Sequence, residues 1–273
     1  IRDSLERGLI EPNSWRIPVI LRLRSDIDAD TVRRVITEIV NHHDALRMQL
    51  VDTAGVVEQR IGAQIDSVDL ITATIGAGLE AGEEGRRHEI IQVLDDAVAG
   101  SHETVVPLIS AHVTAPDGPT YLALSVHGLV ADSESRDILL TDVFTAFGQV
   151  LAGEEITLAP VAAPWREWSQ LSAELAVHPA VQATREYWLN ATADVNLALT
   201  GGGVAERPSA RHFIRVATAL TENQTTELDD ARRRLTFPLD HFVLTALGRT
   251  VAGVLADGQL AVDLAGNGLS LIH

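Results

Sequence analysis

The chain has 273 residues, of which 46% are hydrophobic and 4% aromatic, and it contains no cysteine. This length allows one large domain or two lobes with an ordinary core, and the missing cysteines exclude thiol nucleophiles, disulfides and cysteine-ligated zinc. The formal net charge of −17 disfavours nucleic acids and anionic membranes as partners, because both are negatively charged. No stretch approaches the ~18 consecutive apolar residues of a membrane span, so we expect a cytoplasmic protein. The chain begins with Ile1 rather than methionine, so we expect it to be part of a longer protein.

The first part of the chain alternates predicted strands and helices. Alternation of apolar and polar residues is typical of strands, which are expected at residues 15–23, 56–61, 105–113 and 121–126. Apolar residues spaced three and four apart indicate helices, which are expected from the N-cap candidates Asp28, Asp30 and Thr31 to about residue 42, and at residues 83–99 and 135–151. Asp117-Gly118 marks a turn, so the strands on either side of it are expected to pair as a hairpin.

The second part follows a Pro/Ala-rich linker at residues 158–164. Helices are predicted at residues 165–189, from Thr221 to about residue 235, and at residues 238–255. The second of these begins with an approximate capping box between Thr221 and Gln224, and the third is apolar nearly all round and is expected to be buried. Strands are predicted at residues 211–219 and 260–264, and a glycine-rich loop at residues 200–208.

This order of elements predicts an α/β fold in which helices cover mixed sheets. The linker divides it into an N-terminal lobe, residues 1–160, and a linker helix with a partial C-terminal lobe, residues 161–273.

The most informative stretch for function is VHGLVADSES at residues 126–135, between a predicted strand and a predicted helix. Loops in this position hold side chains at a cleft. The stretch resembles the HHxxxDG motif of the condensation domains of nonribosomal peptide synthetases. In a gap-free alignment His127 takes the place of the first His, Gly128 of the second His, Asp132 of the Asp and Ser133 of the Gly.

Three further stretches support the resemblance, which spans nearly the whole chain. Residues 42–47 (HHDALR) resemble the family's RHExLR motif, in which His43, Leu46 and Arg47 match while His42 and Asp44 differ. Residues 165–188 are similar to the helix between the family's two lobes, and residues 264–268 to its GHGR stretch, with Leu269 where an Arg is usual. The resemblance implies two lobes like chloramphenicol acetyltransferase with a tunnel between them, the second lobe being incomplete in this chain.

The resemblance also implies a reaction and its partners. In this family an amide or ester forms between an acyl donor and an acceptor that are carried on the phosphopantetheine arms of two carrier proteins. The second His of the motif acts as base or positions the acceptor, for which an imidazole is suited because its pKa lies near neutrality. The Asp is structural, through a salt bridge to an Arg, and for Asp132 one possible partner is Arg47. Adjacent assembly-line domains are further expected partners; the domain itself needs no cofactor.

Gly128 removes the imidazole at the catalytic position, and a general base typically contributes ~10²–10⁴-fold in rate. Two alternatives would restore the activity: a shifted register with His127 as the working base, or His127 reaching the tunnel from the first position. A third alternative, an engineered substitution at residue 128, would explain the presence of the glycine. The leading hypotheses are thus an impaired acyltransferase and an inactive domain that recruits a carrier protein or tailoring enzyme. Gly128 weakens the hypothesis of an epimerisation domain equally, because such domains use the same second His. Gly128→His is expected to restore product in an intact scaffold.

Simpler structural interpretations stand beside these. His127 taken alone is typical of a buried, hydrogen-bonded histidine, and His42 and His43 fit a helix C-terminus electrostatically. A zinc site made from these three histidines and Asp132 has no supporting ligand spacing, so no metal is predicted. Ser133 fits helix capping. Residues 232–234 (RRR) fit a solvated helix face, with carrier-protein or phosphate contact as the functional alternative.

Overall fold

The computed structural model describes residue 13, residues 15–53, 56–76, 82–101, 105–116, 118–193 and 216–255, and residues 260, 262 and 264. The chain divides into two compact units, Ile1–Leu175 and Ala176–His273, and each is described by itself. The division at residues 160 and 161 that the sequence suggested stays a prediction.

The first unit contains most of the described secondary structure. In chain order its elements are β1 (Arg16–Arg22), α2 (Ala29–His42), the 3-10 helix η2 (Asp44–Arg47), β2 (Met48–Thr53), β3 (Val56–Ile61), β4 (Leu70–Thr74), α3 (Gly82–Ala99), β5 (Leu108–Thr114), β6 (Thr120–His127), α4 (Ser133–Leu151) and α5 (Trp165–Ala176). Four strands form a sheet in the order β1-β6-β5-β4, and β2 pairs with β3 separately. The sheet is mixed, because β4 runs parallel to β5 while β1 and β5 both run antiparallel to β6.

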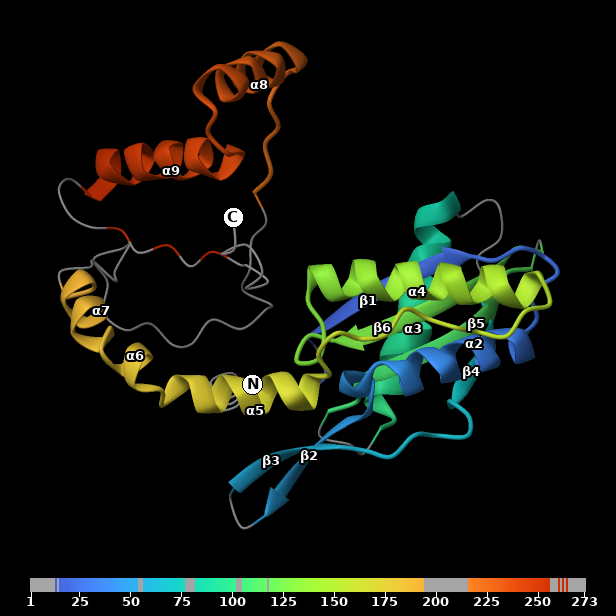
Figure 1. Ribbon diagram of the computed structural model, residues 1–273. Helices are drawn as coiled ribbons and strands as arrows, with labels where there is room; N and C mark the ends of the chain where they lie inside the picture. The colour runs from blue at the N-terminus through green and yellow to red at the C-terminus, as the bar shows by residue number, and fades with distance from the viewer. Residues whose placement is uncertain are drawn as a thin grey trace. The chain divides into compact units, whose positions relative to one another are not determined.

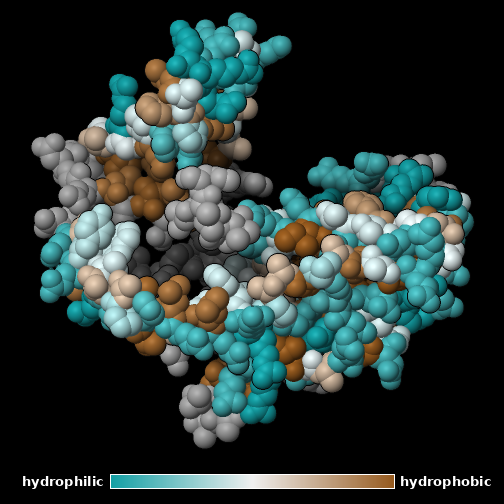
Figure 2. Space-filling view, in the orientation of Figure 1, coloured by the Kyte–Doolittle hydropathy of each residue, from teal (hydrophilic) through white to brown (hydrophobic). Residues whose placement is uncertain are grey.

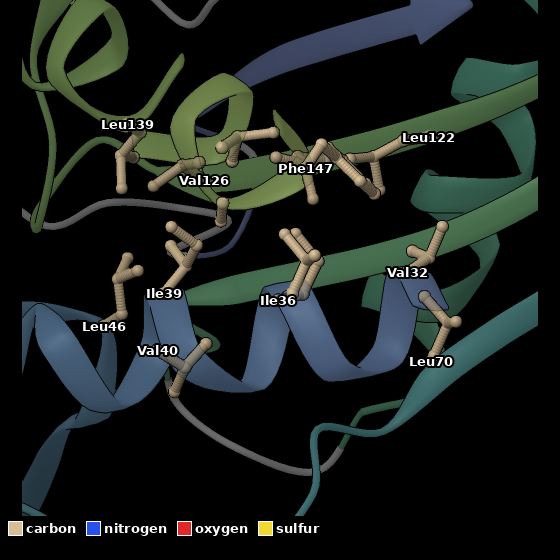
Figure 3. Close-up of a cluster of buried hydrophobic side chains, with 14 of the residues drawn as sticks. Val32, Ile36, Ile39, Val40, Leu46, Leu70, Leu122, Val126, Leu139 and Phe147 are labelled. Atoms are coloured by element: carbon tan, nitrogen blue, oxygen red, sulfur yellow. The ribbon is translucent and has the colours of Figure 1, made fainter. Parts of the chain in front are cut away.

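Helices α2 and α4 cover one face of the sheet, and α3 covers the other (Figure 1). Figure 3 shows how the α2 face is filled: Ile36 and Ile39 of α2 point toward Val126 of β6 and Phe147 of α4. These side chains are almost completely buried, and each contributes ~1.5–3 kcal/mol of hydrophobic free energy on folding. This cluster therefore fixes where β6 ends and α4 begins.

The opposite face of the sheet has its own, smaller core. Ile90 and Leu94 of α3 pack on Ala111 and Val113 of β5 and on Ala123 of β6. Because successive side chains of a strand point to opposite faces, the residues of β6 that alternate with Val126 face α3. His127 at the end of β6 thus belongs to the α3 face.

The second unit is helical where it is described, and its side chains are largely exposed. Its elements are α6 (Pro179–Gln182), α7 (Arg185–Ala191), α8 (Glu222–Leu235) and α9 (Leu239–Leu255). The prediction that α9 is buried is wrong: Val243 and Leu247 are exposed, and Figure 2 shows apolar side chains gathered over this helix. The apolar sequence shows only that α9 needs a packing partner, and the described residues of this unit do not cover it.

The helix predicted over residues 165–189 is three shorter helices. Pro179 is the first residue of α6, and His178 before it has an extended backbone, with φ −64° and ψ 135°. A proline has no N–H to donate and pushes the preceding residue out of the helical region, which explains the break between α5 and α6.

Other predictions from the sequence are confirmed. Asp28 caps α2 by accepting a hydrogen bond from Thr31 N, Thr221 and Gln224 form a capping box at α8, and β5 pairs with β6 around a turn in which Gly118 has φ +102°. Strands β2 and β4 were not predicted. The expected strands at 211–219 and 260–264 are absent from those of their residues that the structure describes, and the loop at 200–208 lies outside them.

Within the described ranges no helix is long and apolar enough to cross a membrane. The cytoplasmic location stays a prediction.

Candidate functional site

The candidate site is the loop that joins the end of β6 to the start of α4. His127 closes the strand, and its backbone carbonyl accepts hydrogen bonds from Val130 N (3.0 Å) and Ala131 N (3.2 Å), which curl the loop into a tight turn. Asp132 then caps α4. The predicted strand-to-helix frame of the motif is therefore formed, because the strand end, the turn and the helix start are each fixed by hydrogen bonds.

The His127 side chain is fully buried on the α3 side of the sheet. Its Nδ1 accepts a hydrogen bond from Leu129 N (3.0 Å), so the ring carries its proton on Nε2. A substrate has no access to a side chain with no exposed surface. This geometry opposes both alternatives in which His127 is the working base and agrees with a structural role for it.

Arg16 lies next to His127 in the sheet, because the two residues are directly paired between β1 and β6. Its guanidinium donates to Ser125 Oγ (2.7 Å), to Ser125 O (2.5 Å) and to Val106 O (2.8 Å). Burial lowers the pKa of Arg16 to about 10, while the carboxylate of Asp95 acts in the opposite direction. Arg16 remains a cation at neutral pH, and its donors tie β1, β6 and the segment before β5 together beneath the loop.

Gly128 follows His127 and faces Trp15, the residue before β1. The Gly128 N–H donates to Trp15 O (2.8 Å). A Cβ placed on Gly128 would lie 2.6 Å from both Cδ2 and Nε1 of the Trp15 ring, and closer still to Cε2. The indole thus stands where any side chain at position 128 would begin.

Asp132 holds the start of α4. Its Oδ1 accepts hydrogen bonds from Ser135 N (2.8 Å) and Ser135 Oγ (2.7 Å), and these bonds lower the pKa of the Asp132 carboxyl. The suggested salt bridge to Arg47 is not formed, because Asp132 is engaged by its own helix. Ser133 is the first helical residue rather than the cap, and it is exposed. The capping role expected for Ser133 therefore belongs to Asp132.

The earlier motif, residues 42–47, lies where α2 ends. Arg47 Nη1 donates to Val40 O (2.6 Å) and Asn41 O (2.7 Å), and its Nε donates to Gly62 O (3.2 Å). The last carbonyls of a helix have no partner within the helix, so Arg47 satisfies two of them and joins α2 to the end of β3. This is the contact that replaces the expected one with Asp132.

His43 links α2 to α4. Its Nε2 lies 2.7 Å from Asp142 Oδ2, and both side chains are mostly buried. Burial lowers the pKa of His43, although Asp142 acts to raise it. Burial is the larger effect, so at neutral pH the contact is a hydrogen bond from a neutral imidazole to a carboxylate.

His42 completes a group with these two residues, because ligand-type atoms of His42, His43 and Asp142 all lie within 4.8 Å of one another. The edge-to-face contact of the neighbouring His42 and His43 rings, together with the His43–Asp142 hydrogen bond, accounts for this proximity without a metal. The zinc set considered from the sequence is not assembled, since His127 faces α3 and Asp132 caps α4.

Comparison with known proteins identifies the class to which this fold and loop belong. The family profile described as Condensation domain matches residues 6–259, so the chain belongs to the condensation domain family. It is 41% identical over 274 residues to one component of the phenolphthiocerol/phthiocerol polyketide synthase of Mycobacterium tuberculosis (strain ATCC 25618 / H37Rv), an alignment that covers 98% of this chain and 18% of that protein. It is 24% identical to bacitracin synthase 3 of Bacillus licheniformis, over 94% of this chain and 4% of that protein. The chain therefore spans less than a fifth of the length of these relatives.

Solved structures share the fold. The epimerization domain from the third module of tyrocidine synthetase B has a TM-score of 0.72 at 24% identity, covering 92% of this chain and 57% of that one. The X-domain in its complex with OxyB from teicoplanin biosynthesis has a TM-score of 0.67 at 20% identity, covering 92% and 54%. The α/β fold of the condensation domains, like that of chloramphenicol acetyltransferase, is thus the fold of this chain.

Sequence reasoning missed Trp15 and Arg16 as parts of this region, because they read as the start of a strand. Asp142 lies in the helix predicted after the motif, and only its contact with His43 was missed. An arginine at the start of a β-rich stretch was the one available signal for Arg16, because a buried cation needs partners. The residues of the last motif, 265–268, lie outside the described residues.

Proposed function

We propose that this condensation domain does not catalyse acyl transfer with its motif loop and serves its assembly line by binding a carrier protein or a tailoring enzyme. One observation carries the proposal: position 128 has no side chain, and an indole fills the space in front of it. Attack of an amine or alcohol on a thioester requires transfer of a proton, and a glycine accepts none.

The neighbouring polar groups do not replace the missing base. His127 is buried with Nδ1 already accepting a hydrogen bond, and the Asp132 carboxylate is occupied at the start of α4. Hydrogen bonds to the ionised form lower the pKa of Asp132, which makes it a weaker base. The loop keeps its framework and has lost its proton acceptor.

The relatives indicate the partners. We propose that the domain contacts donor and acceptor carrier proteins through their phosphopantetheine arms, together with adjacent assembly-line domains, because the relatives are synthases of which this chain matches only 18% and 4%. A binding role has a parallel in the X-domain, which was solved as a complex with OxyB. In this view the fold supplies a docking surface, and the chemistry takes place elsewhere.

The test offers the domain a loaded donor carrier and a loaded acceptor carrier and measures condensed product by mass spectrometry. We expect no product above the reaction without enzyme, while binding of the holo carrier protein is detectable by calorimetry. An active condensation domain with its own carriers serves as the positive control. Product at the rate of the active domain would refute the silent-site proposal, and absence of carrier binding would refute the docking part.

A second candidate is acyl transfer without a general base. The observation in its favour is the intact strand-to-helix frame of the loop, which allows donor and acceptor to be held in position even without an imidazole. In that case the same assay yields slow product, and the rate rises with pH until the acceptor amine is fully deprotonated. If no product forms at any pH, acyl transfer without a general base is excluded and the binding role remains.

A further inference from the structure

The missing imidazole at position 128 is accompanied by a second feature, the aromatic ring of Trp15. The three atoms nearest to a Cβ built on Gly128 all belong to this ring, and two of them, Cδ2 and Nε1, lie 2.6 Å away. Carbon atoms in contact normally lie ~3.5–4.0 Å apart. Even alanine at position 128 therefore overlaps with the indole.

The glycine is required here for space and not for its backbone freedom. Gly128 does not have a positive φ, unlike Gly82, Gly118 and Gly153. Its backbone is therefore open to every amino acid that has an N–H to donate to Trp15 O, and the indole is what excludes a side chain.

The backbone of Trp15 is held in place by hydrogen bonds. Its carbonyl accepts the hydrogen bond from Gly128 N (2.8 Å), and the next residue, Arg16, is paired with His127 in the sheet and held by three side-chain hydrogen bonds. Relief of the overlap has to come from rotation of the indole, which is 49% exposed and so has solvent on its other side.

We infer that Trp15 is an occluding residue: its indole occupies the place of the catalytic imidazole, so Gly128 and Trp15 act as a pair. The inference rests on the proposed silent site and adds the element that keeps it shut. It changes the expectation drawn from the sequence, because Gly128→His alone leaves the new ring in competition with the indole. A base at position 128 needs a small residue at position 15.

The first test is a double-mutant cycle on stability. Gly128→Ala is expected to lower Tm by roughly 2–8 °C when Trp15 is present, or to displace the indole, seen as a shift of the Trp15 indole N–H signal by NMR. In the Trp15→Ala background the same change is expected to leave Tm nearly unchanged. Trp15→Phe identifies the Trp15 signal among those of the four tryptophans of the chain.

Gly148→Ala is the matched control, because a Cβ at this glycine of α4 meets nothing within 4 Å. It is expected to keep or raise Tm, since alanine favours a helix more than glycine does. An equal effect of Gly128→Ala in both backgrounds, with an unmoved Trp15 signal, would overturn the pairing.

The second test measures product from loaded carriers with Gly128→His and with the double variant Trp15→Ala/Gly128→His. The double variant is expected to be at least ~10-fold faster than the single one, since a positioned base contributes 10²–10⁴-fold. Equal rates, including zero for both, overturn the claim that the indole keeps the site shut. The wild-type rate decides the proposed function separately, because it involves neither substitution.

Discussion

The two motif regions of the first unit, residues 42–47 and residues 127–133, have retained different parts of what the family uses. In the earlier motif Arg47, His43 and Asp44 all have protein partners, on α2, α4 and α5. In the later motif Asp132 and His127 keep framework hydrogen bonds, while Gly128 has no side chain. The difference teaches that the contacts holding the fold are separable from the group that performs chemistry. The fold depends on buried hydrogen bonds and packing, and a single exposed imidazole contributes little to either.

The largest effect is expected from Arg47→Met, which tests whether the earlier motif is structural. Three carbonyl oxygens lose their donor, and hydrogen bonds to charged groups contribute ~1.5–3 kcal/mol each in favourable cases. We expect the free energy of unfolding, measured by urea titration, to fall by about 2–4 kcal/mol. Arg60→Met is the control: Arg60 forms an exposed ion pair with Glu58, and such pairs contribute ~0–1 kcal/mol. Similar losses of unfolding free energy in both variants would show that the hydrogen bonds of Arg47 do not stabilise the fold more than an exposed ion pair does.

The next effect is expected from Asp44→Ala at the start of α5. Asp44 Oδ1 accepts from Trp165 N (2.9 Å), and Oδ2 accepts from Arg166 N (3.2 Å). Loss of such a cap costs about 1–2 kcal/mol, and amide exchange at Trp165 and Arg166 is expected to accelerate. Asp44→Asn keeps one carbonyl acceptor and is expected to retain part of the protection. Unchanged exchange in Asp44→Ala would mean that η2 does not hold α5.

A smaller effect is expected from Asp132→Ala in the later motif. The cap of α4 is lost, which lowers the free energy of unfolding by about 1 kcal/mol, while Asp132→Asn loses less because Asn is also a good N-cap. The hydrogen bonds from Ser135 hold the pKa of Asp132 below its usual value. Its contribution is therefore fully present above the unfolded pKa of about 3.9 and is lost as the pH falls toward the lower, folded pKa. Urea titrations at pH 5 and pH 3 check this, and an equal acid dependence in wild type and Asp132→Asn would contradict it.

The smallest effect is the pH dependence caused by His43. Burial lowers its pKa in the folded protein, so the unfolded chain, with a His pKa of about 6.5, takes up the proton first as the pH falls. Stability is therefore expected to decrease as the pH falls below about 7, and His43→Gln is expected to reduce this slope. Asp142→Asn removes the partner that raises the pKa, and it is expected to steepen the slope. A slope in His43→Gln as large as in wild type would show that other groups cause it.

The sequence by itself determined the local elements and the family. The spacing of apolar residues predicted α2 and α4, the Thr221–Gln224 pattern predicted the start of α8, and the alternating stretches around Gly118 predicted the β5–β6 hairpin. These features depend on residues close together in the chain, whose preferences are expressed whatever surrounds them. The frame of the motif loop could be aligned for the same reason. Strands β2 and β4 were not predicted from the sequence, because short strands take their stability from the neighbours with which they pair.

Only the tertiary structure decided the partners of the motif side chains. Arg47 of η2 binds the end of α2 instead of Asp132, and His127 faces α3 because of its place in the alternation of β6. The position of Trp15 in front of Gly128 follows from the register of β1 on β6, two strands that are far apart in the sequence. Register and available space are properties of packed, non-local contacts, so the sequence showed that an imidazole was missing and the structure showed what stands in its place.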